Sequence, residues 1–351
     1  MHQQLLTLLK AGLWGKRSEE LEGFPLSAER WKEVFELARR QTVTGIVYQG
    51  ITMLPEEMMP PQPLLIRWVA EVDRIEANNQ QMERALKELL SMYRVHDIHP
   101  IVMKGQGTAA MYDISTLREC GDIDLYFIND KESERARNLL HTKGITYEVH
   151  ADRSMCYTWM GIEVEHHTEL VDLHRPKNRM YAAQLINEQG YIPMTTAGGT
   201  EIEVASPLIN MLMQSTHILK HALGKGIGLR QLCDMARTYH YLQGKINQTT
   251  LHEIYAAVGL QRWNELLHAF LTQHLGLPHQ LQPYKSLQQV DTTPLLRIIE
   301  KGGNFGQHRT QATEKNSRIR TALCIWEQRR FSWKYARKEA VWMVFRLVVK
   351  G

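Results

Sequence analysis

Apolar side chains recur at helical spacing through the first part of the chain. Over residues 28–53 and 64–97 they return every third or fourth position, which predicts two helices. Ser27 stands just before the first helix and can accept a hydrogen bond from its first turn. The proline-rich residues 54–63 predict a turn between the helices, because proline disrupts the interior of a helix.

The pattern changes at Ile98, where short runs of β-prone residues begin. The expected strands cover residues 98–103, 123–128, 145–150, 157–159 and 162–167. Between them we expect a short helix that ends near Asp113 and a longer helix over 131–143, and Met160-Gly161 suits the hairpin turn between the last two strands. This order predicts a mixed sheet with helices packed on it. Helical spacing then returns near residues 207–222, 228–243, 249–258 and 261–275.

The elements together predict an α+β fold, with a mixed sheet, flanking helices and further helical segments at both ends of the chain. We expect an N-terminal helical segment over residues 1–97 and an α/β core over 98–175. A C-terminal helical domain is expected over 176–313, followed by a basic, aromatic-rich C-terminal helix over 314–351.

The composition is that of an ordinary globular protein, with 43% hydrophobic and 23% charged residues, and 351 residues suit about two domains. No apolar run approaches the roughly 18 residues of a membrane span, and residues 1–16 do not resemble a signal peptide. The four cysteines are scattered without a Cys-x-x-Cys pair. We therefore expect a cytoplasmic protein with neither a disulfide framework nor a zinc site.

The positive charge is concentrated at the end of the chain. Residues 315–351 hold ten basic and two acidic residues, a net charge of +8, which leaves −4 for the rest of a chain whose total is +4. The aromatic residues of this segment could stack on nucleic-acid bases, but packing against the body of the protein is the favoured interpretation. Nucleic acid is therefore a possible partner and not the preferred one, and the salt dependence of binding would separate the two.

Asp122 and Asp124 are the most informative residues of the sequence. Side chains alternate between the two faces of a strand, so these carboxylates share one face while Ile123 and Leu125 can pack into a core on the other. Two neighbouring carboxylates on a buried strand repel each other and need a cation. A hard divalent ion such as Mg²⁺ prefers oxygen ligands of this kind. Gly121 leaves room for a ligand to approach the backbone closely.

A second candidate motif precedes the aspartates, where an apolar strand runs into a turn that contains glycine. Backbone N–H groups at the start of the following helix are suited to phosphate, as are the Lys104 ammonium and the Thr108 hydroxyl. Gly105 and Gly107 would let the phosphate approach the backbone. Alternatively, Lys104 is a surface cation, because Gly-x-Gly turns are common.

A third acidic residue is expected on a nearby strand, and there are two candidates. Residues 162–167 alternate, so that Glu163, Glu165 and His167 share one face. Asp172 offers a second acid-x-His pattern a few residues later. We favour Glu165, because the pleat fixes the direction of its side chain and its strand can pair beside that of the aspartates.

The chain resembles a known family at several motifs, which are Lys104-Gly105, Arg118, Gly121-Asp122-Ile123-Asp124, an acid-x-His strand, His217, His221, and the segments 226–234, 11–15 and 40–43. In this combination they resemble the uncharacterised nucleotidyltransferase family of the DNA polymerase beta superfamily, most closely its members from Bacteroidetes. The resemblance spans most of the chain. It departs from the wider superfamily at Lys104-Gly105-Gln106-Gly107, where a Gly-Gly or Gly-Ser turn is usual.

The resemblance implies a minimal nucleotidyltransferase fold and transfer of a nucleoside monophosphate from an NTP, with release of pyrophosphate. Asp122 and Asp124 would hold two Mg²⁺ ions, and Glu165 matches the acid-x-His position. Lys104 and the turn after it would hold the triphosphate. The acceptor could be a small molecule, a sugar, a protein or an RNA end.

Two further pairs lie on the helices of the second half. Arg230 and Asp234 are four residues apart on one helix face and are expected to close the site, unless they form only an ion pair within the helix. His217 and His221 have the same spacing. Without a glutamate at the right place, packing or contacts to the acceptor are favoured over zinc.

Three alternative functions need consideration. A glycosyltransferase would use an Asp-x-Asp motif to hold a metal and a nucleotide-sugar, but it usually needs a larger Rossmann-like unit where this chain is helical. A haloacid-dehalogenase phosphatase is excluded, because Tyr126 stands where it needs Thr or Val. A catalytically silent nucleotide-binding or antitoxin-like module would be favoured by the loss of one aspartate, and both are present.

Overall fold

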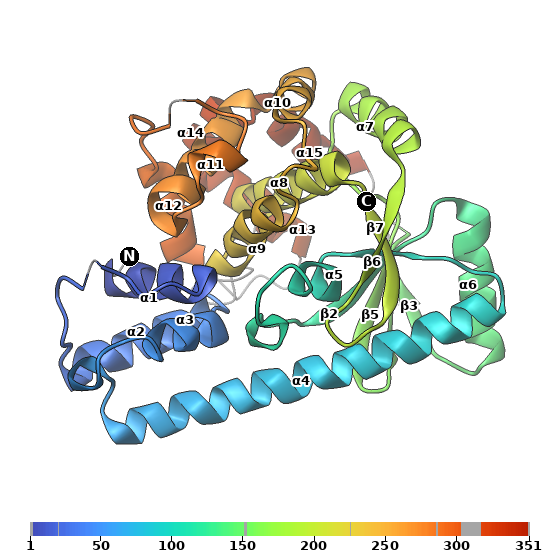
Figure 1. The fold of residues 1–351 in the computed structure, drawn as a ribbon. Coiled ribbons are helices and arrows are strands. Elements are labelled where there is room, and N and C mark those ends of the chain that lie inside the picture. Colours follow the sequence, from blue (N-terminus) through green and yellow to red (C-terminus); the bar gives the residue numbers. More distant parts are fainter. Residues whose placement is uncertain are drawn as a thin grey trace.

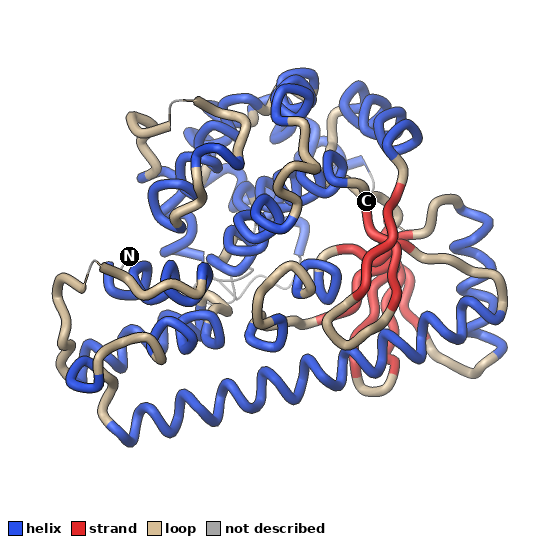
Figure 2. The backbone as a smooth tube through the Cα atoms, viewed as in Figure 1, coloured by secondary structure: helices blue, strands red, loops and turns tan. Residues whose placement is uncertain are grey.

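The computed structural model describes residues 3–19, 21–150, 153–224, 226–285, 287–302 and 317–349. Within these ranges the fold is α+β, as predicted, with a mixed sheet and helices packed around it (Figures 1 and 2). The strands are β1 (Ile101–Met103), β2 (Asp122–Tyr126), β3 (Tyr147–Val149), β4 (Met155–Trp159), β5 (Ile162–His167), β6 (Tyr191–Thr195) and β7 (Glu201–Ala205). The helices before and within the sheet are α1 (Gln3–Trp14), α2 (Ala28–Arg40), α3 (Thr44–Ile51), α4 (Gln62–Val95), α5 (Gly105–Ala109), α6 (Asp130–Thr142) and α7 (Pro176–Gln189). The later helices are α8 (Pro207–Leu223), α9 (Leu229–Tyr241), α10 (Gln248–Ala257), α11 (Gln261–Leu275), α12 (Thr293–Gly302), α13 (Ser317–Glu327), α14 (Arg329–Tyr335) and α15 (Arg337–Val349), and 3-10 turns lie at η1 (Glu56–Met58), η2 (Ser115–Leu117) and η3 (His279–Leu281).

The sheet has the strand order β3-β4-β5-β2-β1-β7-β6. The pairs β2–β5 and β1–β7 are parallel, and the other neighbours are antiparallel. The strand of Glu165 therefore pairs beside the strand of Asp122 and Asp124, as predicted. The β6–β7 hairpin lies outside the predicted core of residues 98–175, and it joins the sheet through the parallel pairing of β7 with β1. The sheet is thus completed by residues that follow α7 in the chain.

Helix α4 connects two hydrophobic cores. Its 34 residues correspond to about 50 Å at 1.5 Å per residue, and in Figure 1 it runs along both halves of the molecule. Trp68 and Val72 in its first half belong to a core that they share with the N-terminal and C-terminal helices. Met82 and Leu86 in its second half belong to the core on the sheet. The apolar stripe of this helix therefore holds the two halves on one support.

The predicted helix over residues 28–53 is in fact two helices, α2 and α3. Thr42 separates them, because its φ of 52° is in the left-handed region and cannot continue a right-handed helix. Gln41 uses the break to bind two distant segments. Its Nε2 donates to the carbonyl oxygen of Ile299 at 3.2 Å, and its Oε1 accepts from the backbone N–H of Leu229 at 3.0 Å. The hydrogen bonds of Gln41 thus connect the N-terminal helices to α9 and α12.

The C-terminal segment forms three helices, α13, α14 and α15, rather than the single helix predicted over residues 314–351. The predicted start of that segment lies outside the described residues. Phe331 and Tyr335 are buried, which agrees with the expected packing on the body, whereas Trp326 and Trp333 are 68% and 65% exposed. Only part of the aromatic set therefore serves to dock the segment.

Glu339 fastens α15 to the start of α7. The Glu339 side chain is buried, and its Oε2 accepts from the backbone N–H groups of His174 at 2.6 Å and Arg175 at 3.2 Å. Its Oε1 accepts from Nδ2 of Asn178 at 2.6 Å. A carboxylate from the end of the chain thus satisfies the donors at the N-terminus of α7.

Glu339→Ala should lower the free energy of unfolding by about 2–3 kcal/mol, because buried donors that lose their acceptor cost about 1–3 kcal/mol. Urea denaturation followed by circular dichroism would measure this loss. The matched control is Lys338→Ala, which changes the exposed neighbour on the same helix and should alter stability by at most about 0.5 kcal/mol. Equal losses in the two variants would show that the contacts of Glu339 do not hold the segment.

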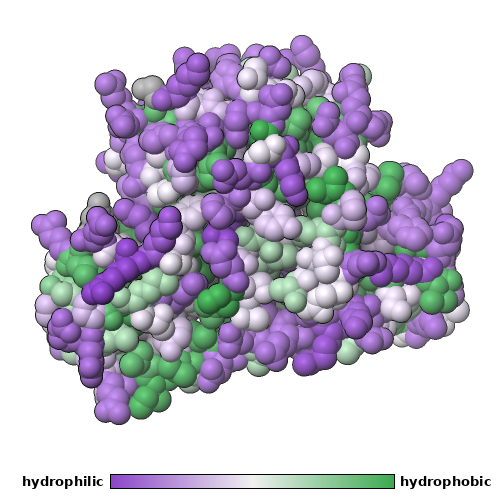
Figure 3. Space-filling view, in the orientation of Figure 1, coloured by the Kyte–Doolittle hydropathy of each residue, from purple (hydrophilic) through white to green (hydrophobic). Residues whose placement is uncertain are grey.

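Hydrophilic side chains cover most of the molecular face in Figure 3, and apolar side chains are confined to small patches. Among the helices in the described ranges, none combines the length and the apolar character that a membrane span needs. Cys120, Cys156, Cys233 and Cys324 are all free thiols.

Candidate active site

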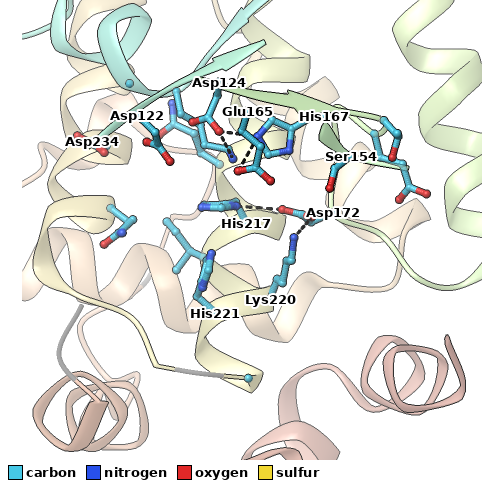
Figure 4. Close-up of a pocket in the computed structure, with 18 of the residues that line it drawn as sticks. Asp122, Asp124, Ser154, Glu165, His167, Asp172, His217, Lys220, His221 and Asp234 are labelled. Atoms are coloured by element: carbon cyan, nitrogen blue, oxygen red, sulfur yellow. Dashed lines mark hydrogen bonds and ion pairs between the residues drawn. The ribbon is translucent and has the colours of Figure 1, made fainter. Parts of the chain in front are cut away.

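A cavity of about 770 Å³ lies between the sheet and the helices that follow it in the chain (Figure 4). β2 and β5 line one wall, and α8 and α9 line the facing wall. Met343 and Arg346 of α15 also reach the cavity. Its volume is within the range of ligand sites, about 300–1,000 Å³.

The parallel pairing of β2 and β5 brings the acidic residues of the two strands together. In the register of this pair, Asp124 lies opposite Glu165. Ile123 and Leu125 are buried on the other face of β2, which fixes the two aspartates on the face that lines the cavity. The alternation of polar and apolar residues therefore decides which side chains meet.

Asp124, Glu165 and His167 form a group that could hold a metal ion. Each offers a ligand atom, and these atoms all lie within 4.8 Å of one another. Nε2 of His167 is 2.5 Å from Oδ1 of Asp124 and 3.6 Å from Oε2 of Glu165. Two carboxylates and an imidazole are a donor set that fits a divalent cation. Asp122 lines the same cavity but lies outside this group.

The charges around the two aspartates are strongly coupled. The charge of Asp124 and then burial raise the pKa of Asp122 to about 6. Burial alone would also raise the pKa of Asp124, but Lys104 and His167 outweigh it and hold that pKa below its ordinary value. Asp124 therefore ionises before Asp122 as the pH rises, and a cation at the site would favour ionisation of both.

The turn after β1 lies beside the aspartates. Nζ of Lys104 is 3.6 Å from Oδ1 of Asp124, and the backbone of Lys104 has a φ of 37°, which is a strained conformation for a residue with a side chain. Gly105 has a φ of 39°, and a Cβ atom there would lie 3.1 Å from the carbonyl oxygen of Asp122. Glycine at position 105 thus allows the close approach of the turn to β2.

Only some residues of the predicted phosphate-binding turn face the cavity. Lys104, Gly105 and Thr108 line the cavity. A Cβ atom at Gly107 would instead meet the Val204 side chain at 3.4 Å, an ordinary contact distance, so Gly107 faces β7 rather than the cavity. Gly121 has open space around it.

Arg230 and Asp234 of α9 both line the cavity. Asp234 accepts two hydrogen bonds from Arg118, at 2.6 and 3.0 Å, and a third from the hydroxyl of Tyr112 at 2.7 Å. Nη1 of Arg230 donates to the carbonyl oxygen of Glu119 at 2.7 Å. Both residues therefore connect α9 to the loop before β2, which is more than an ion pair within one helix.

Asp172 lies in a second polar cluster on the opposite side of the cavity (Figure 4). Its Oδ2 is 3.0 Å from Nδ1 of His217, and its Oδ1 accepts from Nζ of Lys220 at 2.7 Å. The ring of His221 lies 4.4 Å from that of His217, centroid to centroid. Asp172, His217 and His221 were candidates from the sequence and Lys220 was not, but local patterns do not indicate that they meet, because Asp172 and His217 are 45 residues apart.

His167 is the main residue that the sequence analysis left out of the expected site. Two signals pointed to it, which are the alternation in β5 that puts His167 on the face of Glu165 and the acid-x-His pattern that Glu165 and His167 form.

Most of the chain matches the model of a known protein family. A family model described as uncharacterised nucleotidyltransferase matches residues 27–276, which include the sheet, the cavity-lining strands and helices α8 and α9. No curated protein and no solved structure matches the chain. Because the matched region covers well over half of the chain, the protein is a member of the uncharacterised nucleotidyltransferase family.

Proposed function

We propose that this protein is a Mg²⁺-dependent, cytoplasmic enzyme that transfers a nucleoside monophosphate from an NTP to an acceptor and releases pyrophosphate. The observation that carries the proposal is the group of Asp124, Glu165 and His167 at one wall of a ligand-sized cavity, with Lys104 beside it. Carboxylates at a metal site and a cation for phosphate are the two requirements of this chemistry.

In this proposal the acidic wall of the cavity is the metal site. Asp122, Asp124 and Glu165 act as metal ligands, and the imidazole of His167 either completes the set or orients Asp124. Two Mg²⁺ ions, when bound there, would neutralise charge that develops on the attacking and leaving oxygens.

The nucleotide would lie between this wall and the cations that surround it. Lys104 and the hydroxyl of Thr108 would hold phosphate oxygens, which is supported by their position in the cavity lining, and Gly105 would keep the turn close to β2. Gly107 and Gly121 do not line the cavity, so any part they have in nucleotide binding would be indirect, through the backbone of α5 and of the residue before β2. Arg230 and Asp234 close the cavity from α9, Asp234 by holding Arg118 in the wall.

The direct test is incubation of the full-length protein with each α-labelled NTP and Mg²⁺, with pyrophosphate release and transfer of label as the readouts. We expect both with at least one NTP, and EDTA should abolish them. Calorimetric binding of Mg²⁺–NTP without pyrophosphate release would instead favour a silent nucleotide-binding module. No binding of any NTP would overturn the proposal.

A narrower prediction concerns Lys104. Lys104→Ala should weaken binding of the Mg²⁺–NTP complex about tenfold or more, because a charge-assisted bond to phosphate contributes roughly 1.5–3 kcal/mol. Binding of the uncharged nucleoside should change little, since it lacks the phosphates. Calorimetry with both ligands would measure the difference. Equal losses for nucleoside and triphosphate would mean that Lys104 only supports the turn.

A further inference from the structure

We propose that His217, held by Asp172, is the general base that takes the proton from an acceptor hydroxyl. This inference rests on the proposed nucleotidyl transfer and adds the chemical class of the acceptor. The Asp172–His217 pair lines the same cavity as Asp122 and Asp124 but lies across it from them (Figure 4).

The protonation states of the pair follow from its contacts. Burial alone would raise the pKa of Asp172, but Lys220 and His217 outweigh it and hold that pKa well below its ordinary value. Asp172 is therefore an anion, which can only accept hydrogen bonds. Since Nδ1 of His217 is 3.0 Å from its Oδ2, the hydrogen of the neutral imidazole is on Nδ1. The lone pair is consequently on Nε2.

Nε2 is the nitrogen of His217 that remains for a ligand. It has no hydrogen-bond partner among the residues that the structure describes, and 14% of the side chain is exposed at the cavity wall. Figure 4 shows the ring with Nδ1 turned to Asp172 and its other end directed into the space below Asp122. An acceptor between the two walls would meet the base on one side and the nucleotide on the other.

The electrostatic setting keeps His217 neutral in the free protein. Burial and then Lys104 lower the pKa of His217 to about 4, so at pH 7 the ring carries no charge and the lone pair of Nε2 is available. Asp172 opposes this shift. The phosphates of a bound nucleotide would also raise the pKa of His217, because nearby negative charge favours the protonated ring.

The step balances without any further reactant. The acceptor oxygen attacks the α-phosphorus and forms a P–O bond, while the bond from the α-phosphorus to the bridging oxygen breaks and its electron pair leaves with pyrophosphate. The hydroxyl proton passes to Nε2 of His217, and the imidazolium later loses it to solvent. Asp172 accepts from Nδ1 throughout and stabilises the imidazolium.

A base of this kind selects among acceptors. Phosphate and carboxylate acceptors are already ionised at neutral pH and have no proton to give up, whereas an alcohol needs a base to become a nucleophile. The Asp172–His217 pair therefore points to a hydroxyl acceptor, such as that of a sugar or of a serine, threonine or tyrosine side chain. Asp172 and Lys220 are positioning residues, because they act through His217.

The test uses His217→Ala and chemical rescue. With α-labelled NTP and Mg²⁺, and with water and glycerol as hydroxyl probes, kcat for pyrophosphate release should fall about 100-fold or more. The dissociation constant of Mg²⁺–NTP should stay within about twofold, because the base acts on the acceptor. Added imidazole should raise the rate of His217→Ala at least about tenfold. This rescue should increase with pH as the imidazole loses its proton.

His221→Ala is the matched control, because it removes a second imidazole one turn along the same helix. Imidazole should not accelerate this variant. Asp172→Asn should lower kcat less than His217→Ala and should also resist rescue. The inference is overturned if wild type is active and His217→Ala keeps its rate, or if imidazole fails to rescue a folded His217→Ala that binds Mg²⁺–NTP. Absence of NTP binding by the wild type would instead overturn the proposed function.

Discussion

Asp124→Asn should lower the rate of nucleotidyl transfer by roughly a thousandfold or more while the protein stays folded. Asp124 makes the shortest contact of the candidate metal site, with His167 at 2.5 Å, and also lies 3.6 Å from Lys104. Loss of its charge would remove a metal ligand. A bound metal contributes several kcal/mol to the stabilisation of transition-state charge. About 4 kcal/mol corresponds to three orders of magnitude in rate.

Pyrophosphate release under saturating Mg²⁺–NTP would measure this change, and thermal melting would check the fold. Asp97→Asn is a suitable control, because Asp97 is exposed and has a φ of 54°, a conformation that asparagine tolerates well. It should retain the wild-type rate. If Asp124→Asn bound Mg²⁺–NTP as tightly as wild type and kept its turnover, the metal assignment would be wrong.

Asp234→Ala should lower the free energy of unfolding by about 3–5 kcal/mol, which is the usual cost of removing one member of a buried ion pair. The side chains of Arg118 and Asp234 are 5% and 9% exposed, and two hydrogen bonds join them. Without Asp234, the guanidinium of Arg118 and the hydroxyl of Tyr112 would both lose a buried partner. Urea unfolding would measure the loss.

The double variant Arg118→Met, Asp234→Leu separates stability from function. Apolar side chains of similar volume should recover most of the lost stability, because they need no partner. If the pair also shapes the nucleotide site, this variant should still bind Mg²⁺–NTP more weakly than wild type. Recovery of both stability and binding would limit Arg118 and Asp234 to a structural role.

Features encoded within a few residues were predictable from the sequence. Ser27 accepts from the backbone N–H of Arg30 at 3.3 Å, as its position before an apolar helix indicated. Met160 and Gly161 have φ angles of 50° and 80° and form the expected turn between β4 and β5. The facing of Asp124 with Glu165 could be anticipated for the same reason, because the pleat fixes the direction of each side chain.

Features that depend on distant pairings were not predictable from local patterns. Arg118 and Asp234 are 116 residues apart, and nothing in the spacing of α9 indicates that Asp234 binds Arg118. The β6–β7 hairpin is a short alternating pair of strands whose place in the sheet is set by β1. The left-handed Thr42 divides an apolar stripe that is otherwise continuous, because backbone conformation at one residue outweighs the helical period.

The shared helix α4 has a consequence for how the molecule comes apart. Its second half covers the sheet core, where the hydroxyls of Tyr93 and Tyr157 are hydrogen-bonded at 2.9 Å, and Trp68 and Val72 of its first half belong to the core of the helices. If either half of α4 unfolded, apolar side chains in the core on which that half packs would become exposed. Because the helix is continuous, unfolding of one half would also destabilise the other half and its core. The sheet and the helices should therefore unfold as one cooperative unit. A fragment cut at the boundaries of the sheet would lack α4, which covers the apolar core on the sheet.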